Sequence, residues 1–210
     1  MGVLEIVFHS LFLVICLTGL IWRIFVLKDQ GLFIFEYETW CVFVEACYYC
    51  LQSLFGCIMA CNRTSKSCLI DFLKYTLFKL IFPPIMACPV IFFLGYQLGW
   101  FYFYVNINSP EFWCHMINHL IAPGCVLVDV LLFGRKYTPS NLFDIIVITA
   151  VYVAYTILCL PFQTNQVYDF LTNGKGFIIC AAFVFYCIGI VMHFFYITIT
   201  KVRNCGVTES

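Results

Sequence analysis

Five polar side chains on one apolar segment have the types and the spacing that chemistry requires. On an ideal helix of about 3.6 residues per turn they fall within about 120° of arc, so they form one stripe. The five residues are His115, Asn118, His119, Cys125 and Asp129. Polar groups are costly in apolar surroundings, so the stripe is expected to face the interior of a helix bundle. There its side chains either form hydrogen bonds to neighbouring helices or belong to a functional site.

Thr39, in another apolar segment, is a candidate nucleophile. A threonine hydroxyl attacks a carbonyl carbon once an adjacent base takes its proton, and imidazole is the commonest base of this kind. A hydroxyl in the first turn of a helix is also a preferred capping group. The residues alone leave both interpretations of Thr39 open.

The composition places these residues in a membrane protein. Of the 210 residues, 63% are hydrophobic and 10% are charged, against roughly 45–50% and about 25% in ordinary soluble domains. So few charges cannot cover a water-soluble surface. The net charge is zero, with 11 basic and 11 acidic residues, so there is no overall basic field to attract nucleic acid.

Apolar segments, each long enough for the roughly 20 residues of a spanning helix, are separated by short polar breaks. They cover Val3–Leu27, Thr39–Ala60, Leu80–Tyr104, Phe112–Phe133, Leu142–Phe162 and Gly176–Thr200. We therefore predict an all-α integral membrane protein, a bundle of six transmembrane helices that forms one domain over residues 1–210. The first segment lacks a basic leader and a small-residue cleavage site, which argues against a signal peptide. Pro123 and Gly124 are expected to kink the fourth helix.

The positions of Lys and Arg predict the orientation of these helices, because basic residues near helix ends are retained in the cytoplasm. One side, shared by both termini, carries Arg63, Lys66, Lys74, Lys79, Arg135, Lys136, Lys201 and Arg203. The other side carries Arg23, Lys28 and Lys175. Both termini are therefore expected in the cytoplasm, and the four tryptophans near the luminal or extracellular interface of the endoplasmic reticulum or the plasma membrane. Thr39 then shares the outer layer with His115 and His119.

The 14 cysteines indicate neither a metal site nor a disulfide framework. Most stand singly or in pairs within apolar runs, where a thiol behaves as a small apolar group. Cys57 and Cys61 lack a matching second pair and histidines at the spacing of a zinc finger. We expect no metal, no cofactor and no nucleic-acid partner, and we expect membrane lipids as partners.

Two motifs resemble those of a family of six-span membrane proteins. Asn118–Pro123, followed by Val128–Phe133, resembles the fourth-helix signature of the androgen-induced membrane hydrolases, the insect rolling-stone proteins and their bacterial relatives. Tyr37–Trp40 resembles the second-helix motif, although Glu38 stands where the family usually has leucine. Further similarity is found at Tyr152, Tyr155 and Val167–Leu171. The androgen-induced hydrolases place one more residue between the histidine and the proline.

The resemblance implies a lipid-ester hydrolase that acts on fatty-acid esters of hydroxy fatty acids. Residue by residue, it makes Thr39 the nucleophile and His119 its base, with His115 as the alternative base. Asn118 and Tyr155 are candidate donors to the oxyanion that ester hydrolysis creates.

Asp129 is expected to be structural, because it lies roughly 15 Å along an ideal helix from His119. Two other classes of function remain open. A transporter or channel would use the polar stripe as its pathway, although no internal repeat typical of transporters is present. A membrane scaffold or fusion-related protein, like rolling stone, would need neither Thr39 nor His119.

Overall fold

A computed structural model describes residues 2–27, 37–61, 71–72 and 108–133, together with short pieces between 143 and 158 and between 190 and 202. The regular elements in this part are all helical. They are α1 (Val3–Leu27), α2 (Tyr37–Cys61), α6 (Pro110–Met116), the π-helix η3 (Ile117–Ile121) and α7 (Ala122–Phe133). The predicted span Leu80–Tyr104 lies outside the described residues, and the last two predicted spans are described only at scattered positions, which are helical.

The helices predicted at the first, second and fourth segments are confirmed, with small shifts at their ends. α1 has the predicted bounds, and α2 extends slightly beyond both of its predicted ends. α6 begins at Pro110 because the Ser109 hydroxyl caps it, accepting a hydrogen bond from the Phe112 N–H at 3.2 Å. Serine at the cap and proline in the first turn are both preferred at helix starts.

The disturbance predicted at Pro123 takes the form of a π turn just before it. Within η3 the Ala122 N–H donates to the Ile117 carbonyl, five residues back. Proline has no N–H, and its ring crowds the carbonyl four residues earlier, so an α-helical turn cannot be completed there. The wider π turn accommodates this defect, and such turns occur frequently at functional sites.

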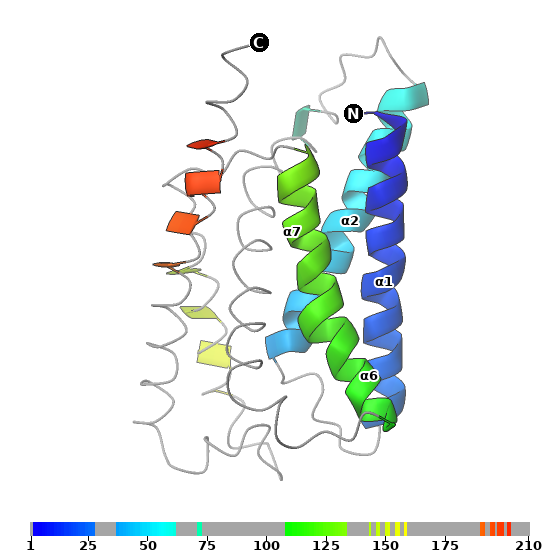
Figure 1. The fold of residues 1–210 in the computed structure, drawn as a ribbon, viewed down its shortest axis with the longest axis vertical. Coiled ribbons are helices and arrows are strands. Elements are labelled where there is room, and N and C mark those ends of the chain that lie inside the picture. Colours follow the sequence, from blue (N-terminus) through cyan, green and yellow to red (C-terminus); the bar gives the residue numbers. More distant parts are fainter. Residues whose placement is uncertain are drawn as a thin grey trace.

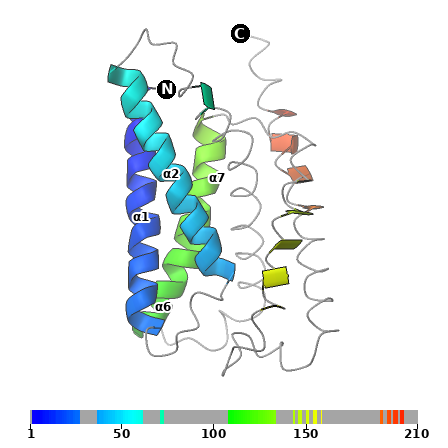
Figure 2. The ribbon, with the colours of Figure 1, turned by 180° about the vertical axis from the view of Figure 1, so that it is seen from behind.

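The helices pack as antiparallel neighbours. Figures 1 and 2 show α2 and the continuous α6–η3–α7 helix running in one direction and α1 running in the other. α1 contacts α2 along its length and also contacts α6, η3 and α7. The first turn of α2 and the start of α6 therefore lie at the same end of the bundle, opposite the N-terminus.

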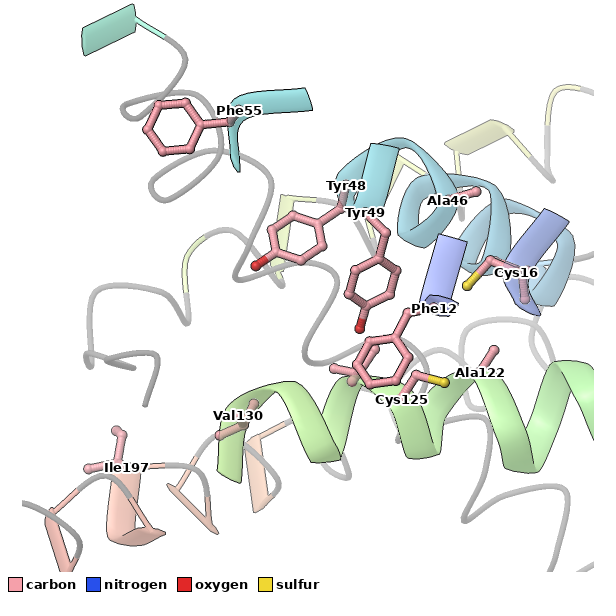
Figure 3. Packing of buried hydrophobic residues seen from close by; sticks show 12 residues of the cluster. Phe12, Cys16, Ala46, Tyr48, Tyr49, Phe55, Ala122, Cys125, Val130 and Ile197 are labelled. Carbon is pink, nitrogen blue, oxygen red and sulfur yellow. The ribbon is translucent and has the colours of Figure 1, made fainter. Parts of the chain in front are cut away.

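The core lies where these three helical rods meet. Phe12 and Cys16 of α1 face Tyr49 of α2 and Cys125 of α7, and all four are buried. Figure 3 shows Tyr49 projecting from α2 toward α7. Aromatic rings pack edge to face here, with 5.3 Å between the ring centroids of Phe12 and Tyr49. Ile197, from the C-terminal part of the chain, joins the same cluster at 9% exposure.

The outward face of α1 is apolar. Exposed side chains recur along its whole length, at Val3, Leu4, Val7, Leu11, Val14, Leu17, Ile21, Trp22, Ile24 and Phe25. In the most apolar stretch of 18 residues in α1, only 22% is buried, whereas the core helix of a soluble protein is mostly buried. A large exposed apolar surface marks contact with lipid or with another protein. α1 and α2 thus have the length and the hydropathy of membrane-spanning helices.

Candidate functional site

The Thr39 hydroxyl has no structural use within the described part of the chain. Thr39 lies in the first turn of α2, and its half-buried side chain has a buried Oγ1 with no hydrogen-bond partner. A capping oxygen accepts a hydrogen bond from a backbone N–H of the turn that follows. Capping therefore does not explain this threonine.

The two candidate bases lie on the neighbouring helical rod. The backbone of His115 belongs to α6 and that of His119 to η3, and α2 contacts η3. Thr39 lies at the end of α2 that is level with α6 (Figures 1 and 2). The side chains of both histidines lie outside the described part of the structure.

Tyr155 lies beside the start of α2. Its ring packs against that of Trp40, with 4.7 Å between the ring centroids and 45° between the planes. Because Trp40 directly follows Thr39, this contact brings Tyr155 to the end of α2 that carries the candidate nucleophile.

Asn118 faces α1. Its side chain is 4% exposed, and its Nδ2 donates to the Cys114 sulfur at 3.5 Å, while Oδ1 has no partner among the described residues. A Cβ atom added at Gly19 would lie 2.6 Å from this Oδ1 and 2.8 Å from Cγ2 of Ile117. A side chain at Gly19 would therefore displace the side chains of the π turn, since α1 and η3 are in close contact.

Asp129 joins three helices at a level of the bundle that is separate from Thr39. Its Oδ1 lies 2.9 Å from Nε2 of His9 in α1, and its Oδ2 accepts a hydrogen bond from the Tyr48 hydroxyl in α2 at 3.3 Å. His9 is 0% exposed and Asp129 is 1% exposed. The carboxylate is therefore buried and paired.

Aromatic rings enclose the His9 imidazole. Tyr49 stacks on it at 5.9 Å between centroids, and Phe133 lies at 5.4 Å on a tilted plane. Its second nitrogen, Nδ1, is buried and has no hydrogen-bond partner among the described residues. His9 thus presents one nitrogen to Asp129 and leaves the other unused.

One face of α2 is polar throughout its middle. Glu45, Tyr48, Tyr49 and Gln52 recur at spacings that align on one side of a helix, and all are buried. The Cys16 thiol of α1 donates to Glu45 Oε2 at 3.7 Å. Within the described part of the chain, the Tyr49 hydroxyl and both polar atoms of the Gln52 amide have no hydrogen-bond partner.

The sequence analysis missed the contribution of α1. His9, Cys16 and Arg23 lie seven residues apart, which places them on one face of the helix, and each is at most 1% exposed. The sequence analysis used Arg23 only to predict the orientation of the helices, whereas its side chain is buried in the structure. The seven-residue spacing of polar groups in an otherwise apolar segment is the signal that identifies this face.

No group of three histidine, cysteine or acidic side chains suited to a metal ion is found among the described residues. No family model, curated protein or solved structure matches the chain.

Proposed function

We propose that this chain is a multi-pass membrane protein that hydrolyses lipid esters, with Thr39 as the nucleophile and His119 as its base. The observation that supports this most directly is the buried Thr39 hydroxyl, which makes no hydrogen bond within the described part of the chain. A buried polar group without a partner costs about 1–3 kcal/mol. Such a group is kept at a functional site more readily than elsewhere.

The proposed architecture is a bundle of six transmembrane helices with both termini in the cytoplasm. The apolar outward face of α1 and the lengths of α1 and α2 support it, as does the distribution of basic residues. In this arrangement Thr39 lies near the luminal or extracellular interface of the endoplasmic reticulum or the plasma membrane.

In the proposed reaction, the Thr39 oxygen attacks the ester carbonyl while the His119 imidazole takes the hydroxyl proton. The imidazolium then returns that proton to the departing alcohol, which leaves an acyl ester on Thr39. Water, activated by the same imidazole, hydrolyses this ester and releases the fatty acid. His115 is the alternative base.

The developing oxyanion needs a hydrogen-bond donor. Tyr155 is the better candidate of the two, because its ring lies against Trp40, next to Thr39 in the sequence. The Asn118 amide lies against Gly19 and donates to Cys114, so it contributes mainly to the packing of η3 against α1.

The proposed substrates are long-chain esters that reach the site from the bilayer, with fatty-acid esters of hydroxy fatty acids as the class implied by the motifs. Helices with apolar outward faces allow acyl chains to approach from the lipid.

A fluorophosphonate probe, which labels activated hydroxyls, tests the nucleophile in membranes that carry the full chain. Labelling should be lost in Thr39→Ala and retained in the matched control Thr18→Ala. Thr18 also lies in an apolar helix, but its hydroxyl donates to the Val14 carbonyl at 2.7 Å and is exposed. Equal labelling of the two variants would remove Thr39 from the proposal. No labelling of the unmodified chain, with no hydrolysis across a broad ester panel, would favour a transporter or a scaffold.

A further inference from the structure

A second polar centre, which the proposed hydrolysis does not use, lies toward the N-terminal end of the bundle. It consists of His9, Asp129, Tyr48 and Tyr49. Tyr48 is nine residues from Thr39 along α2, or about 14 Å at 1.5 Å per residue. The centre is therefore separate from the Thr39 layer.

The His9–Asp129 contact is suited to holding a proton. With Asp129 ionised, the Nε2–H of His9 donates to it across 2.9 Å, and the ring is then neutral with an empty Nδ1. A second proton on Nδ1 converts the contact into an ion pair, which the carboxylate stabilises. Ionisable groups within membrane spans commonly serve as proton relays.

Asp129 accepts a second hydrogen bond, from α2. The Tyr48 hydroxyl donates to the second carboxylate oxygen at 3.3 Å, and a hydrogen bond of this kind stabilises the negative charge. Both carboxylate oxygens of Asp129 are thus engaged, one by His9 of α1 and the other by Tyr48 of α2.

Further groups with exchangeable protons continue from this pair toward the centre of the bundle. Tyr49, whose ring stacks on His9, has a buried hydroxyl without a hydrogen-bond partner among the described residues. Glu45 lies four residues from Tyr49, or about 6 Å along α2, and accepts a hydrogen bond from Cys16. Tyr48 and Tyr49 of α2 contact the pair directly. The other buried titratable groups near this part of the core are Glu45 of α2, Cys16 of α1 and Cys125 of α7.

We propose that His9 and Asp129 form an intramembrane proton-binding site, in which the His9 ring takes up and releases a proton at Nδ1. The observation that carries the proposal is the combination of a paired Nε2 with a buried Nδ1 that lacks a partner among the described residues. The proton is exchanged with water, so no other reactant is needed.

Nitrogen NMR of the full chain, labelled at histidine and reconstituted in bilayers, tests this site directly. The sequence has four histidines, and the His9 signals are those missing from His9→Gln. On acidification from about pH 8 to about pH 5, the range in which histidine changes charge, the Nδ1 signal of His9 should change from the unprotonated to the protonated form. The change should be lost in Asp129→Asn, because the charge that stabilises the imidazolium is gone.

Two further variants keep the test decisive. Tyr48→Phe removes one hydroxyl and keeps the ring, so it should lower the protonated fraction of His9 at the acid end even where Asp129→Asn does not fold. Ser10→Ala removes a neighbouring contact between α1 and α2, the Ser10–Ser53 hydrogen bond at 3.3 Å, and should leave the His9 response intact. An Nδ1 that stays unprotonated at both pH values, or an equal response in the native, Asp129→Asn and Tyr48→Phe chains, would overturn the proposal.

Discussion

The contact between Gly19 and the π turn predicts that Gly19→Ala destabilises the chain. The new methyl group would lie 2.6 Å from the Asn118 Oδ1 and 2.8 Å from the Ile117 Cγ2. Carbon and oxygen atoms in close contact normally lie about 3.3–3.6 Å apart, so α1 must move by most of an ångström or Asn118 must change rotamer. Overpacking of this kind typically costs about 1–3 kcal/mol.

The measurement is the apparent Tm of the purified chain in detergent or nanodiscs. For chains of this length about 1 kcal/mol corresponds to about 2–4 °C, so Gly19→Ala should lower the Tm by several degrees. Gly124→Ala is the matched control, because a Cβ atom there meets nothing within 4 Å. It should leave the Tm unchanged or raise it, since alanine favours helix by up to about 1 kcal/mol.

A double variant separates the two contacts. If the clash with the amide oxygen dominates, Gly19→Ala combined with Asn118→Ala should be less destabilised than the sum of the single changes, because neighbouring sites couple. A Gly19→Ala chain that is as stable as the Gly124→Ala chain would refute the close packing of α1 against η3.

Three other outcomes are expected. Asp129→Asn should lower the Tm, since it weakens a buried pair. It should keep most ester hydrolysis per folded molecule, because the carboxylate lies far from the proposed catalytic pair. Complete loss of activity at normal stability would assign Asp129 to the chemistry. Thr39→Ala and His119→Ala should each lose about as much hydrolysis as the double variant, because residues that act as a unit are strongly non-additive, while Thr39→Ser retains some turnover. Additive losses in matched membranes would separate the two residues. Reporter fusions after Arg135 and after Lys175 should give opposite signals, and the same signal from both would contradict the six-span topology.

The sequence predicted the helices well where their signals are local. The long apolar run of α1 and the serine and proline that start α6 depend only on neighbouring residues. The form of the defect at Pro123 was not predicted, because a kink and a π turn both accommodate a proline within a helix. The contact of this turn with Gly19 was not predicted either, because the two segments are far apart in the sequence. Sequence spacing also placed His115 and Asp129 on one stripe, whereas the π turn between them changes the angular relation that an ideal helix gives.

The candidate site was predictable in part for the same reason. Asn118, Cys125 and Asp129 are buried, as the predicted stripe requires, while the imidazoles of His115 and His119 lie outside the described residues. Asp129 was expected to be structural, but its partner His9, 120 positions away in the sequence, was not predicted. Only packing of the helices brings such distant residues together.

The joining of α1 to α7 through Asp129 has a consequence for how the chain is made. At about 5–20 residues per second, a ribosome needs about 6 to 24 s to synthesise the 120 residues between His9 and Asp129. During that interval α1 has been synthesised, and α7 is not yet present to cover the polar face that contains His9. Lipid does not solvate such a face. In the proposed membrane topology, we therefore expect the N-terminal helix to be held by the insertion machinery, or by a membrane chaperone, until α7 arrives. Chains truncated before Asp129 should consequently remain bound to that machinery and be degraded faster than the full chain.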